Sequence, residues 1–395
     1  NELCPNGVEY KTLGEIATDI YRGSGITRNQ VTESGTPCVR YGEIYTTYGI
    51  WFDHCVSYTN AEQISNRKYF EYGDILFAIT GESVDEIAKS CAYIGHEQCL
   101  AGGDIVVLKH EQDPKYLSYA LATTSAQAQK SRGKVKSKVV HSSVPAIKEI
   151  CVPVPPLEVQ QEIVRILDHF TALTAELNDK LTAELTARKK QYAYYRDKLL
   201  TQQKETTEMT LGDIGAVCMC KRIMKAETSS EGEVPFFKIG TFGKEPDAYI
   251  TREKFDEYRE KYSFPRKGDI LISAAGTIGR TVIYDGKPAY YQDSNIVWLS
   301  NDESKVLNKY LFYYYQLQPW AVSTGGTIAR LYNDNISKAK ITVPSLEAQR
   351  RIVSILDRFD ALCNDLTSGL PAEIEARKKQ YEYYRDKLLS FKVKT

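Results

Sequence analysis

The chain has 395 residues, of which 42% are hydrophobic and 26% are charged, and its formal net charge is zero. This length and composition allow two or three hydrophobic cores and exclude a disordered chain. No apolar run approaches the roughly 20 residues of a membrane-spanning helix, and the first residues show no signal-peptide pattern. The nine cysteines are scattered and form no CxxC pair, so we expect a reduced, cytoplasmic protein.

Residues 1–153 form a first segment with mixed strand and helix signals. GDILFAI (73–79) and AGGDIVVLK (101–109) predict buried strands, and KYLSYALAT (115–123) predicts a helix. The stretch SRGKVKSK (131–138) has four basic residues and no acidic one. Because affinity for phosphate depends on local charge and not on the sum over the chain, this stretch is either a nucleic-acid contact or a solvated loop.

Residues 154–203 predict one long helix. Prolines stop the preceding strand, and apolar residues then recur every three or four positions. The stripe consists of Ile163, Leu167, Phe170, Leu173, Leu177, Leu181, Leu185, Tyr192, Tyr195 and Leu199. A helix from Glu158 to Leu200 would be about 65 Å long, so it needs a partner helix of similar length to bury this stripe.

Residues 204–342 resemble the first segment only loosely. GDILISA (268–274) again predicts a buried strand, and KYLFYYY (309–315) again predicts a helix. The stretch CKRIMK (220–225) has three basic residues and no acidic one, with the same two interpretations as the first basic stretch.

Residues 343–395 repeat the helical segment closely. RKKQYEYYRDKLL (377–389) matches RKKQYAYYRDKLL (188–200) at twelve of thirteen positions, at an offset of 189 residues. Gly369 and Pro371 depart from the first copy, and we expect a kink or short break near Gly369, with Pro371 as the first residue of the restarted helix.

The repeat predicts the architecture. We expect a mixed α/β protein with two small α/β segments joined by two long helices that form an antiparallel coiled coil. The order variable, helical, variable, helical joins end to start, which predicts a circular, pseudo-twofold arrangement. It also places the N-terminus beside the C-terminal helix.

Common catalytic motifs are missing from the sequence. We find no GxxxxGK[ST] phosphate loop, no GxSxG elbow, no HExxH helix and no Asn/Asp-Pro-Pro-aromatic tetrapeptide. Cys91, His96 and Cys99 lack a fourth ligand at zinc spacing, so we expect buried thiols there and no metal.

One further group imitates a nuclease site. Asp293 with Glu303 and Lys305 matches the letters of a D…ExK set, but SNDESKV (300–306) is polar and typical of a turn, not of a strand beside a metal. We therefore expect no catalytic residues.

The helical segments carry a resemblance to a known family. VPPLEVQQEIVRILDHF (154–170), VPSLEAQRRIVSILDRF (343–359) and the repeated RKKQYxYYRDKLL resemble the specificity subunit of type I restriction–modification systems, over essentially the whole chain. The resemblance implies that residues 1–153 and 204–342 are target recognition domains, each reading one half of a bipartite, asymmetric DNA site. It implies that the helices set the gap between the halves.

The resemblance also implies partners. Each helical region would dock one methyltransferase subunit, giving two per chain, and restriction subunits would complete the nuclease. The chain itself would bind no cofactor; S-adenosylmethionine would belong to the methyltransferase subunits, and ATP and Mg to the restriction subunit.

Within the first helix, TAEL stands at 174–177 and again at 182–185, which fits a spacer. Four inserted residues would lengthen the helix by about 6 Å, close to two base pairs at about 3.4 Å each.

Side-chain chemistry predicts the contacts. Arg and Lys suit guanine and phosphate, and we expect DNA contacts from Arg22, Arg28, Arg132, Lys134, Lys136, Lys138, Lys221, Arg222, Lys225 and Arg330. Glycine turns at Gly325 and Gly326 would let the backbone approach the duplex. For the methyltransferase surface we expect Arg188, Lys189, Tyr192, Tyr195, Arg196, Arg377, Lys378, Tyr381, Tyr384 and Arg385. In the alternative interpretation, Tyr192 and Tyr195 only pack the helix pair.

Two other functions remain open at this point. A stand-alone DNA-modifying enzyme would need a catalytic set that the sequence does not show. A coiled-coil scaffold that never touches DNA would explain the helices but not the globular segments.

Overall fold

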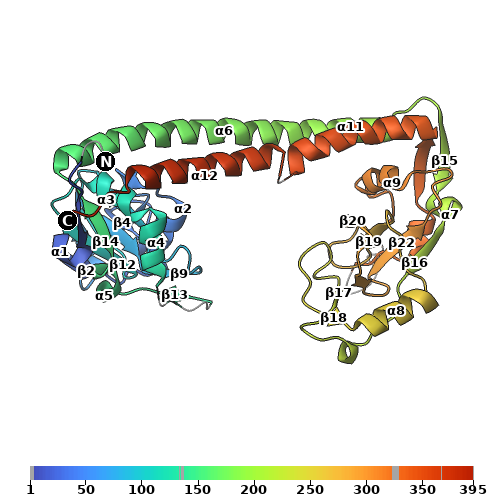
Figure 1. The fold of residues 1–395 in the computed structure, drawn as a ribbon, viewed down its shortest axis with the longest axis horizontal. Helices are drawn as coiled ribbons and strands as arrows, with labels where there is room; N and C mark the ends of the chain where they lie inside the picture. Colours follow the sequence, from blue (N-terminus) through green and yellow to red (C-terminus); the bar gives the residue numbers. More distant parts are fainter. Residues whose placement is uncertain (1–3, 133, 135–137, 323–328, 366, 395) are drawn as a thin grey trace. The chain divides into compact units, whose positions relative to one another are not determined.

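A computed structural model describes residues 4–132, 134, 138–322, 329–365 and 367–394 (Figure 1). The chain divides into two compact units. Unit 1 comprises Asn1–Lys180 and Ile374–Thr395, and unit 2 comprises Leu181–Glu373. Each unit therefore contains one globular segment together with part of both helical segments.

Unit 1 consists of many short strands and a few short helices, followed by the first part of a long helix. In chain order the elements are β1 (Glu9–Thr12), α1 (Leu13–Ile16), β2 (Ala17–Arg22), η1 (Arg28–Gln30), β3 (Val31–Thr32), β4 (Thr36–Val39), α2 (Tyr41–Thr46), β5 (Trp51–Phe52), β6 (Ser57–Thr59), η2 (Ala61–Gln63), β7 (Tyr69–Phe70), β8 (Ile75–Ala78), β9 (Thr80–Gly81), β10 (Ser90–Tyr93), β11 (Cys99–Ala101), β12 (Ile105–His110), α3 (Pro114–Leu121), α4 (Thr124–Ser131), β13 (Val140–His141), α5 (Val144–Lys148), β14 (Cys151–Val154) and α6 (Leu157–Thr201).

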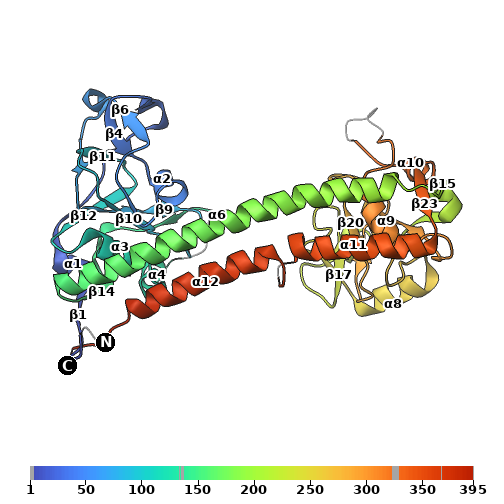
Figure 2. The ribbon, with the colours of Figure 1, turned by 90° about the horizontal axis from the view of Figure 1, so that it is seen from above.

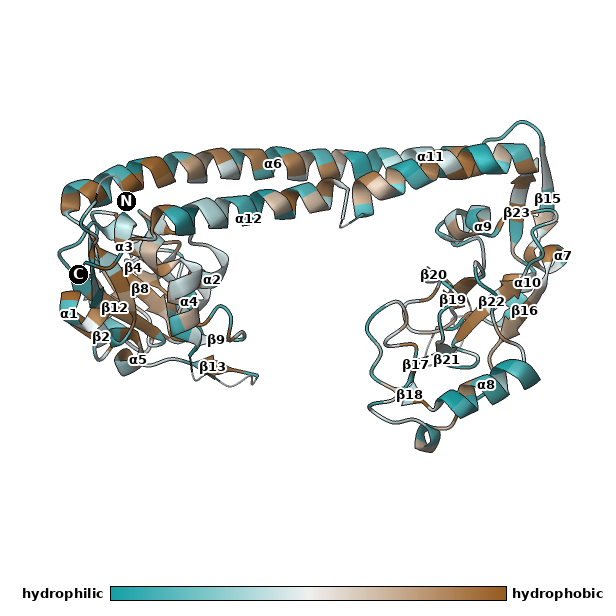
Figure 3. Cartoon of the chain, viewed as in Figure 1, coloured by the Kyte–Doolittle hydropathy of each residue, from teal (hydrophilic) through white to brown (hydrophobic). Residues whose placement is uncertain are grey.

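Two five-stranded sheets form the body of unit 1. Their strand orders are β2-β12-β8-β10-β5 and β3-β6-β4-β11-β7, and Figure 2 shows β4, β6 and β11 in a separate lobe. The predicted strands GDILFAI and AGGDIVVLK become β8 and β12, which lie side by side and antiparallel. Every residue of β8 is buried, as its unbroken apolar run predicts (Figure 3).

Unit 2 repeats four strands of the first of these sheets and keeps a shorter form of the second, because β17 pairs antiparallel with β18 and parallel with β21 as β4 does with β6 and β11. Its elements are β15 (Thr206–Thr210), α7 (Leu211–Ile214), β16 (Ala216–Met219), η3 (Lys225–Glu227), β17 (Val234–Phe237), β18 (Tyr249–Ile250), α8 (Arg252–Lys261), β19 (Ile270–Ser273), β20 (Thr281–Ile283), β21 (Tyr290–Tyr291), β22 (Ile296–Ser300), α9 (Asn308–Tyr315), α10 (Asn333–Ser337), β23 (Lys340–Pro344) and α11 (Leu346–Asn364), with the start of α12 (Leu370–Leu388). The order β16-β22-β19-β20 matches β2-β12-β8-β10, whereas the other sheet is the three-stranded β18-β17-β21.

Both units enter their sheet through the same capped turn. Thr12 and Glu15 form a reciprocal capping box at the start of α1, and Thr210 and Asp213 form one at the start of α7. Such a cap contributes about 1 kcal/mol because it satisfies backbone N–H groups that a helix start leaves unpaired. The two caps lie in the similar sequences KTLGEIA (11–17) and MTLGDIG (209–215), and this shared role explains their likeness.

The long helix is anchored to each globular segment by the same side chains. Gln160 and its counterpart Gln349 are fully buried. The Gln160 amide donates to the carbonyl of Pro155 at 2.8 Å and accepts from the backbone of Asp113 at 3.0 Å. Gln349 donates to the carbonyl of Pro344 at 2.8 Å and accepts from the backbone of Leu307.

A second anchor lies two turns further along each helix. Lys115 pairs with Asp168 at 2.7 Å, and Tyr119 donates to the same carboxylate at 2.8 Å. In unit 2, Lys309 pairs with Asp357 at 2.7 Å, and Tyr313 occupies the position of Tyr119. Two copies of one set of contacts therefore fix the helix on each sheet.

In unit 1 the first part of α6 packs antiparallel against α12. Thr171 is hydrogen bonded to the Tyr381 hydroxyl at 2.9 Å, and Phe170 stacks on Tyr384 at 6.4 Å between ring centroids. Residue numbers fall along one helix as they rise along the other. The chain then returns to its start, where the backbone of Val8 donates to Lys392 at 2.8 Å. The expected closeness of the N-terminal segment to the C-terminal helix is thus present in unit 1.

In unit 2 the last part of α6 packs antiparallel against α11. Tyr192 and Tyr195 both lie on Phe359, with centroid distances of 6.3 and 6.0 Å. Burial raises the pKa of the Cys363 thiol, and the positive charge of Lys189 opposes that shift. Cys363 therefore lies beside a residue that precedes Tyr192 on α6.

The second helical segment is broken, as Gly369 and Pro371 predict. Helix α11 ends at Asn364 and α12 begins at Leu370, one residue before the expected Pro371. A Cβ on Gly369 would lie 2.5 Å from the carbonyl oxygen of Ala361, so only glycine fits this close approach. Hydrogen bonds from Ser368 and Thr367 lower the pKa of Asp365 to about 2, which keeps this carboxylate charged within the break.

Candidate nucleic-acid interface

Three arginines line one groove in unit 1. Arg22 and Arg28 were expected from the sequence, whereas Arg40 was not. The groove has a volume of about 640 Å³ and is lined by Arg22, Gly25, Ile26, Thr27, Arg28, Arg40, Tyr41, Gly42, Glu43, Thr46, Gly102, Gly103 and Asp104. These residues come from the end of β2, the turn after it, helix α2 and the turn before β12, and we call this set the unit 1 groove.

Two of the arginines are hydrogen bonded to acceptors within the protein. The Arg22 guanidinium donates to the carboxylate of Asp104 at 2.6 Å and to the carbonyl of Gly103. Arg40 donates through Nε at 3.0 Å to Glu43, and a terminal nitrogen lies 2.9 Å from the same oxygen. Glu43 is buried and also accepts from Ser57 at 2.5 Å. Such bonds fix the plane of a guanidinium and leave its other N–H groups for a ligand.

The predicted basic stretch is only partly described by the structure. Arg132 and Lys138 are exposed, whereas Lys134 is partly buried and Lys136 falls outside the described residues. The stretch leads into β13, which pairs with β9, and the Tyr45 hydroxyl of α2 donates to the carbonyl of Ala78 just before β9. Both views show α2 close to β9 (Figures 1 and 2). Helix α2, β9 and β13 therefore lie together in unit 1.

In unit 2, two of the predicted arginines meet at one turn. Arg222 pairs with Asp293 at 2.8 Å, and Arg330 donates to the carbonyl of the next residue, Ser294, at 2.9 Å. A hollow of about 370 Å³ lies beside them, lined by Met219, Ser294, Arg330, Leu331, Tyr332, Asn333 and Asp334. We call this set the unit 2 hollow.

The other predicted residues of unit 2 lie apart from this hollow. Lys221 is exposed, with its ammonium 5.2 Å from the centre of the Tyr262 ring. Lys225 is exposed at the start of η3. Gly325 and Gly326 lie outside the described residues.

The groove and the hollow occupy the same place in their sheets. Arg22 pairs with Val106 across β2 and β12, and Met219 pairs with Val297 across β16 and β22. The turn that precedes β12 holds Arg22, and the turn that precedes β22 holds both arginines of unit 2. Neighbouring backbone bonds also correspond, because Ser142 donates to Ile79 in unit 1 as Leu331 donates to Ala274 in unit 2.

Some of the residues expected to bind the methyltransferase are buried between the helices, and others are exposed. Tyr192 is 8% exposed and lies on Phe359, and burial raises its pKa to about 12. Tyr381 is also partly buried, whereas Tyr195 and Tyr384 remain 39% and 43% exposed. Packing between the helices therefore covers much of the side chains of Tyr192 and Tyr381, the first tyrosine in each copy.

The arginines and lysines of this set differ in the same way. Arg196 and Arg385 are largely covered and pair with the following aspartates at 2.7 Å. Arg188 pairs with Glu184 at 2.7 Å. Lys189, Lys378 and Arg377 are exposed.

Two more tyrosines were missed by the sequence reasoning. Tyr194 and Tyr383 are each 60% exposed. Each meets the next tyrosine edge-on at 5.3 Å, and each has a lysine, Lys198 or Lys387, at 5.8 Å from its ring. These tyrosines fall outside the apolar stripe, which is the signal that could have identified them as exposed.

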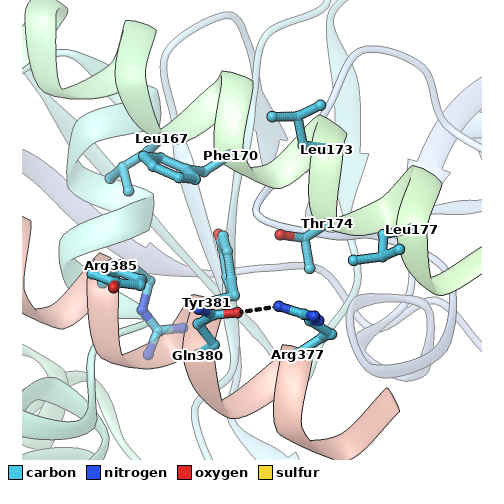
Figure 4. A pocket seen from close by; sticks show the side chains of 10 residues that line it. Leu167, Phe170, Leu173, Thr174, Leu177, Arg377, Gln380, Tyr381 and Arg385 are labelled. Atoms are coloured by element: carbon cyan, nitrogen blue, oxygen red, sulfur yellow. Dashed lines mark hydrogen bonds between the residues drawn. The ribbon is translucent and has the colours of Figure 1, made fainter. Parts of the chain in front are cut away.

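A shallow apolar pocket lies between α6 and α12 in unit 1. Its volume is about 200 Å³, and it is lined by Leu167, Phe170, Leu173, Thr174, Leu177, Arg377, Gln380, Tyr381, Tyr384 and Arg385. Figure 4 shows Thr174 and Leu177 of α6 on the side that faces Arg377 of α12. Phe170 and Leu173 remain 42% and 49% exposed, so the helix pair does not cover the whole stripe.

The side chains that imitate metal or catalytic sites have structural partners. Asp293 is held by Arg222, and Glu303 accepts from the backbone of Asn308 at 2.8 Å. His96 stacks on Tyr72, and Cys99 is hydrogen bonded to the Tyr93 hydroxyl. Within the described residues, no three His, Cys, Asp or Glu side chains are grouped to hold a metal ion. The same part of the chain contains no helix long and apolar enough to cross a membrane.

Comparisons with known proteins agree with this architecture. A chain from a structure of a type I R-M system covers 98% of this chain and is 98% covered itself, with a TM-score of 0.69 and 18% identity. The HsdS subunit from Thermoanaerobacter tengcongensis, also at 18% identity, covers 98% of this chain with 96% of its own length and a TM-score of 0.52. At this level of identity the two structures show a shared fold.

Sequence relatives define the family. A putative type I restriction enzyme specificity subunit of Haemophilus influenzae is 57% identical over 66% of this chain and 68% of its own length. A type I restriction enzyme specificity subunit of Escherichia coli is 37% identical over 62% of this chain and 63% of its own length. The profile of the type I restriction modification DNA specificity domain matches residues 5–187 and 203–376. The chain therefore belongs to the family of type I restriction–modification specificity subunits.

Proposed function

We propose that each unit of this specificity subunit reads one half of a bipartite, asymmetric DNA site. The supporting observation is that the two units share a sheet order but differ in the elements around it. Both units use the same sheet order and the same capped turn, and both place arginines at the turn before the central strand. The second sheet differs, and so do the side chains around each turn. Such a design places two reading surfaces on a common support while giving them different chemistry.

We also propose that the helical segments set the gap between the half-sites. Helix α6 is continuous over 45 residues and contributes to both units. TAEL recurs within it at residues 174–177 and 182–185 without a break in the helix. Insertion of another TAEL would extend α6 by about 6 Å.

The two copies of the helical sequence support docking of two methyltransferase subunits. The exposed pair Tyr194–Tyr195 has an interplanar angle of 74°, and the pair Tyr383–Tyr384 has one of 73°. Exposed tyrosines are favoured at protein interfaces because they combine a large apolar ring with a hydroxyl group. Two surfaces of the same geometry suit two copies of one partner. Restriction subunits would join this complex.

In this proposal the chain contributes recognition and no catalysis. S-adenosylmethionine would be bound by the methyltransferase subunits, and ATP and Mg by the restriction subunits. Purified chain incubated with DNA, metal ion and S-adenosylmethionine should neither cleave nor methylate DNA. Methylation that needs no second polypeptide would support the stand-alone enzyme instead.

Single-molecule methylome sequencing provides the main test. Cells that express this chain with its cognate methyltransferase subunit should methylate one bipartite motif, and cells that express either subunit alone should not. A continuous motif, or a motif unaffected by exchange of residues 204–342 for those of another specificity subunit, would contradict the two-half assignment. A gel shift of the complex that is absent at every salt concentration would favour the scaffold interpretation.

A further inference from the structure

The positive charges of unit 1 are of two kinds. Arg132, Lys134 and Lys138 show no ion pair within the described residues, so their charge is free to attract phosphate. Arg22 and Arg40 are each neutralised by a carboxylate, at 2.6 and 2.9 Å. A neutralised guanidinium attracts phosphate weakly, but it still presents directed N–H donors. Arg22 and Arg40, two of the three arginines that line the groove, are therefore better suited to hydrogen bonding than to charge attraction.

The position of each guanidinium is fixed before any ligand arrives. Glu43 is only 6% exposed, and besides Arg40 it accepts from Ser57 and from the backbone N–H of Arg40 at 3.0 Å. A carboxylate held in this way cannot follow Arg40 outward. Arg22 is bound by both Asp104 and the carbonyl of Gly103. Fixed donors lose little side-chain entropy on binding and can discriminate between ligands.

Two glycines in the groove wall have no role that the folded chain explains. A Cβ on Gly25 or Gly42 would meet nothing within 4 Å, and neither residue has a left-handed φ. By contrast, a Cβ on Gly23 would lie 2.2 Å from a carbonyl oxygen, and one on Gly102 would lie 2.8 Å from another. Glycine at 23 and 102 is thus required by packing, whereas glycine at 25 and 42 leaves open space in the groove. Close approach by a molecule outside the chain would require that space.

We propose that the unit 1 groove receives the edge of a base pair of the DNA site, and that Arg22 and Arg40 read guanine there. This inference rests on the proposed function and names the residues that carry it. An arginine fork donates to O6 and N7 of guanine in the major groove, a pattern that no other base presents. Tyr41, 39% exposed at the groove, supplies an aromatic face beside Arg40.

The basic stretch would have a different role from the groove. Arg132, Lys134 and Lys138 would contact the phosphate backbone, which positions the duplex without reading it. The unit 2 hollow has the corresponding place in its sheet, and there Arg330 is held by Ser294 next to the exposed Tyr332. A held arginine beside an exposed tyrosine therefore occurs in both units, on different local elements.

The test compares two classes of variant in the complex with the methyltransferase subunit. Arg40→Lys and Arg22→Lys each keep the positive charge opposite the carboxylate and remove the fork. Lys134→Gln with Lys138→Gln removes two phosphate contacts. Binding is measured on cognate and mismatched duplexes as a function of salt, after the methylated motif of the wild type has been determined.

The two classes should differ in kind. Each arginine variant should lose about 5- to 150-fold in affinity for the cognate duplex, with an unchanged salt dependence and relaxed methylation at one position of one half-site. The double lysine variant should weaken binding to both duplexes alike and reduce the slope of log K against log salt by about 1.8. Thermal melts identify any variant that fails to fold, and the second arginine variant then carries the test.

The alternative outcomes separate the two levels of the argument. If the wild-type complex methylates a bipartite motif and both arginine variants keep its affinity and discrimination, the groove assignment is wrong and the proposed function stands. If the arginine variants change the salt slope and weaken both duplexes equally, the groove binds phosphate and does not read bases. If the wild-type complex recognises no bipartite site, both proposals fall.

Discussion

Replacement of Gly42 by alanine should raise the stability of the protein and weaken DNA recognition. Gly42 is the second residue of α2, and a Cβ there would meet nothing within 4 Å. Glycine within a helix is less stable than alanine by about 0.5–1 kcal/mol, because the unfolded chain has more freedom to lose. For a domain of this size that difference corresponds to about 1–4 °C in melting temperature.

The same methyl group should obstruct the groove. A DNA atom in contact with Cα at about 3.5–4 Å would have to move outward by more than 1 Å to accept the new carbon. Hydrogen bonds to a base edge tolerate distances of only about 2.7–3.2 Å, so the fork of Arg40 would lose its contact. Loss of one bidentate pair corresponds to about 1–3 kcal/mol, or about 5- to 150-fold in affinity.

The assay needs both measurements on the same protein. Thermal or urea unfolding gives the stability, and titration of the complex with cognate and mismatched duplexes gives recognition. Gly49→Ala is a matched control, because its Cβ would also meet nothing within 4 Å and Gly49 does not line the groove. Gly49→Ala should leave discrimination unchanged. If Gly42→Ala is stabilised and binds the cognate duplex like the wild type, nothing approaches α2 and the argument from the open glycines is refuted.

Three further outcomes follow from other parts of the chain. Burial lowers the pKa of Lys130 to about 7, below its unfolded value of about 10.4. Because the unfolded chain then binds more protons, the free energy of unfolding should rise with pH from 7 to 9 by up to about 1.4 kcal/mol per pH unit. Urea unfolding should show this slope in the wild type and not in Lys130→Met. Insertion of TAEL after residue 185 should widen the gap of the methylated motif by about two base pairs, and altered half-sites would contradict the spacer role. Tyr194→Ala or Tyr383→Ala alone should leave one methyltransferase subunit per chain in native mass spectrometry, and two retained subunits in both variants would remove the tyrosine pairs from the interface.

The helices and the repeat could be predicted from the sequence because their signals are local. An apolar residue every three or four positions identifies α6, and proline and glycine identify the break before α12. The buried strands β8 and β12 were also accessible, since each is an unbroken apolar run next to a turn. The family resemblance came from the same helical segments.

The second sheet of unit 1 could not be predicted in this way. Its strands have two to four residues each, and their order β3-β6-β4-β11-β7 joins positions from Val31 to Ala101. Strands this short carry no periodicity, and their pairing depends on contacts between distant residues. Arg40 was missed for the same reason, because its importance depends on Glu43 and on a turn 60 residues further along the chain. In the structure Glu43 accepts from the backbone N–H of Arg40, but arginine has no acceptor with which to cap a helix, so the sequence carried no cap signal at this position.

The tyrosines on the helices show which side-chain positions a periodic pattern can predict. The stripe identified Tyr192 and Tyr195, and the structure places both of them against Phe359. A residue of the stripe packs against the partner helix of the same chain, so less of its surface remains for contact with another protein. Tyr194 and Tyr383, which lie outside the stripe, are the more exposed members of each copy.

The location of the groove within unit 1 suggests how such a chain can change its target without losing its fold. One wall is formed by the turn after β2 and the turn before β12, two neighbouring strands of the sheet order that both units share. The opposite wall is α2, which follows β4 of the second sheet; in unit 2 the second sheet has only three strands, and the fully described stretch between β17 and β18 contains no helix. The unit 2 hollow has the corresponding turn on one side and Arg330–Asp334 on the other. The shared wall fixes where a base edge would lie relative to the helix anchors at Gln160 and Gln349, and the unshared wall determines which hydrogen-bonding groups meet it. If the groove reads a base as proposed, substitutions on the unshared wall would alter the base that is read while the sheet and the helix anchors remain in place.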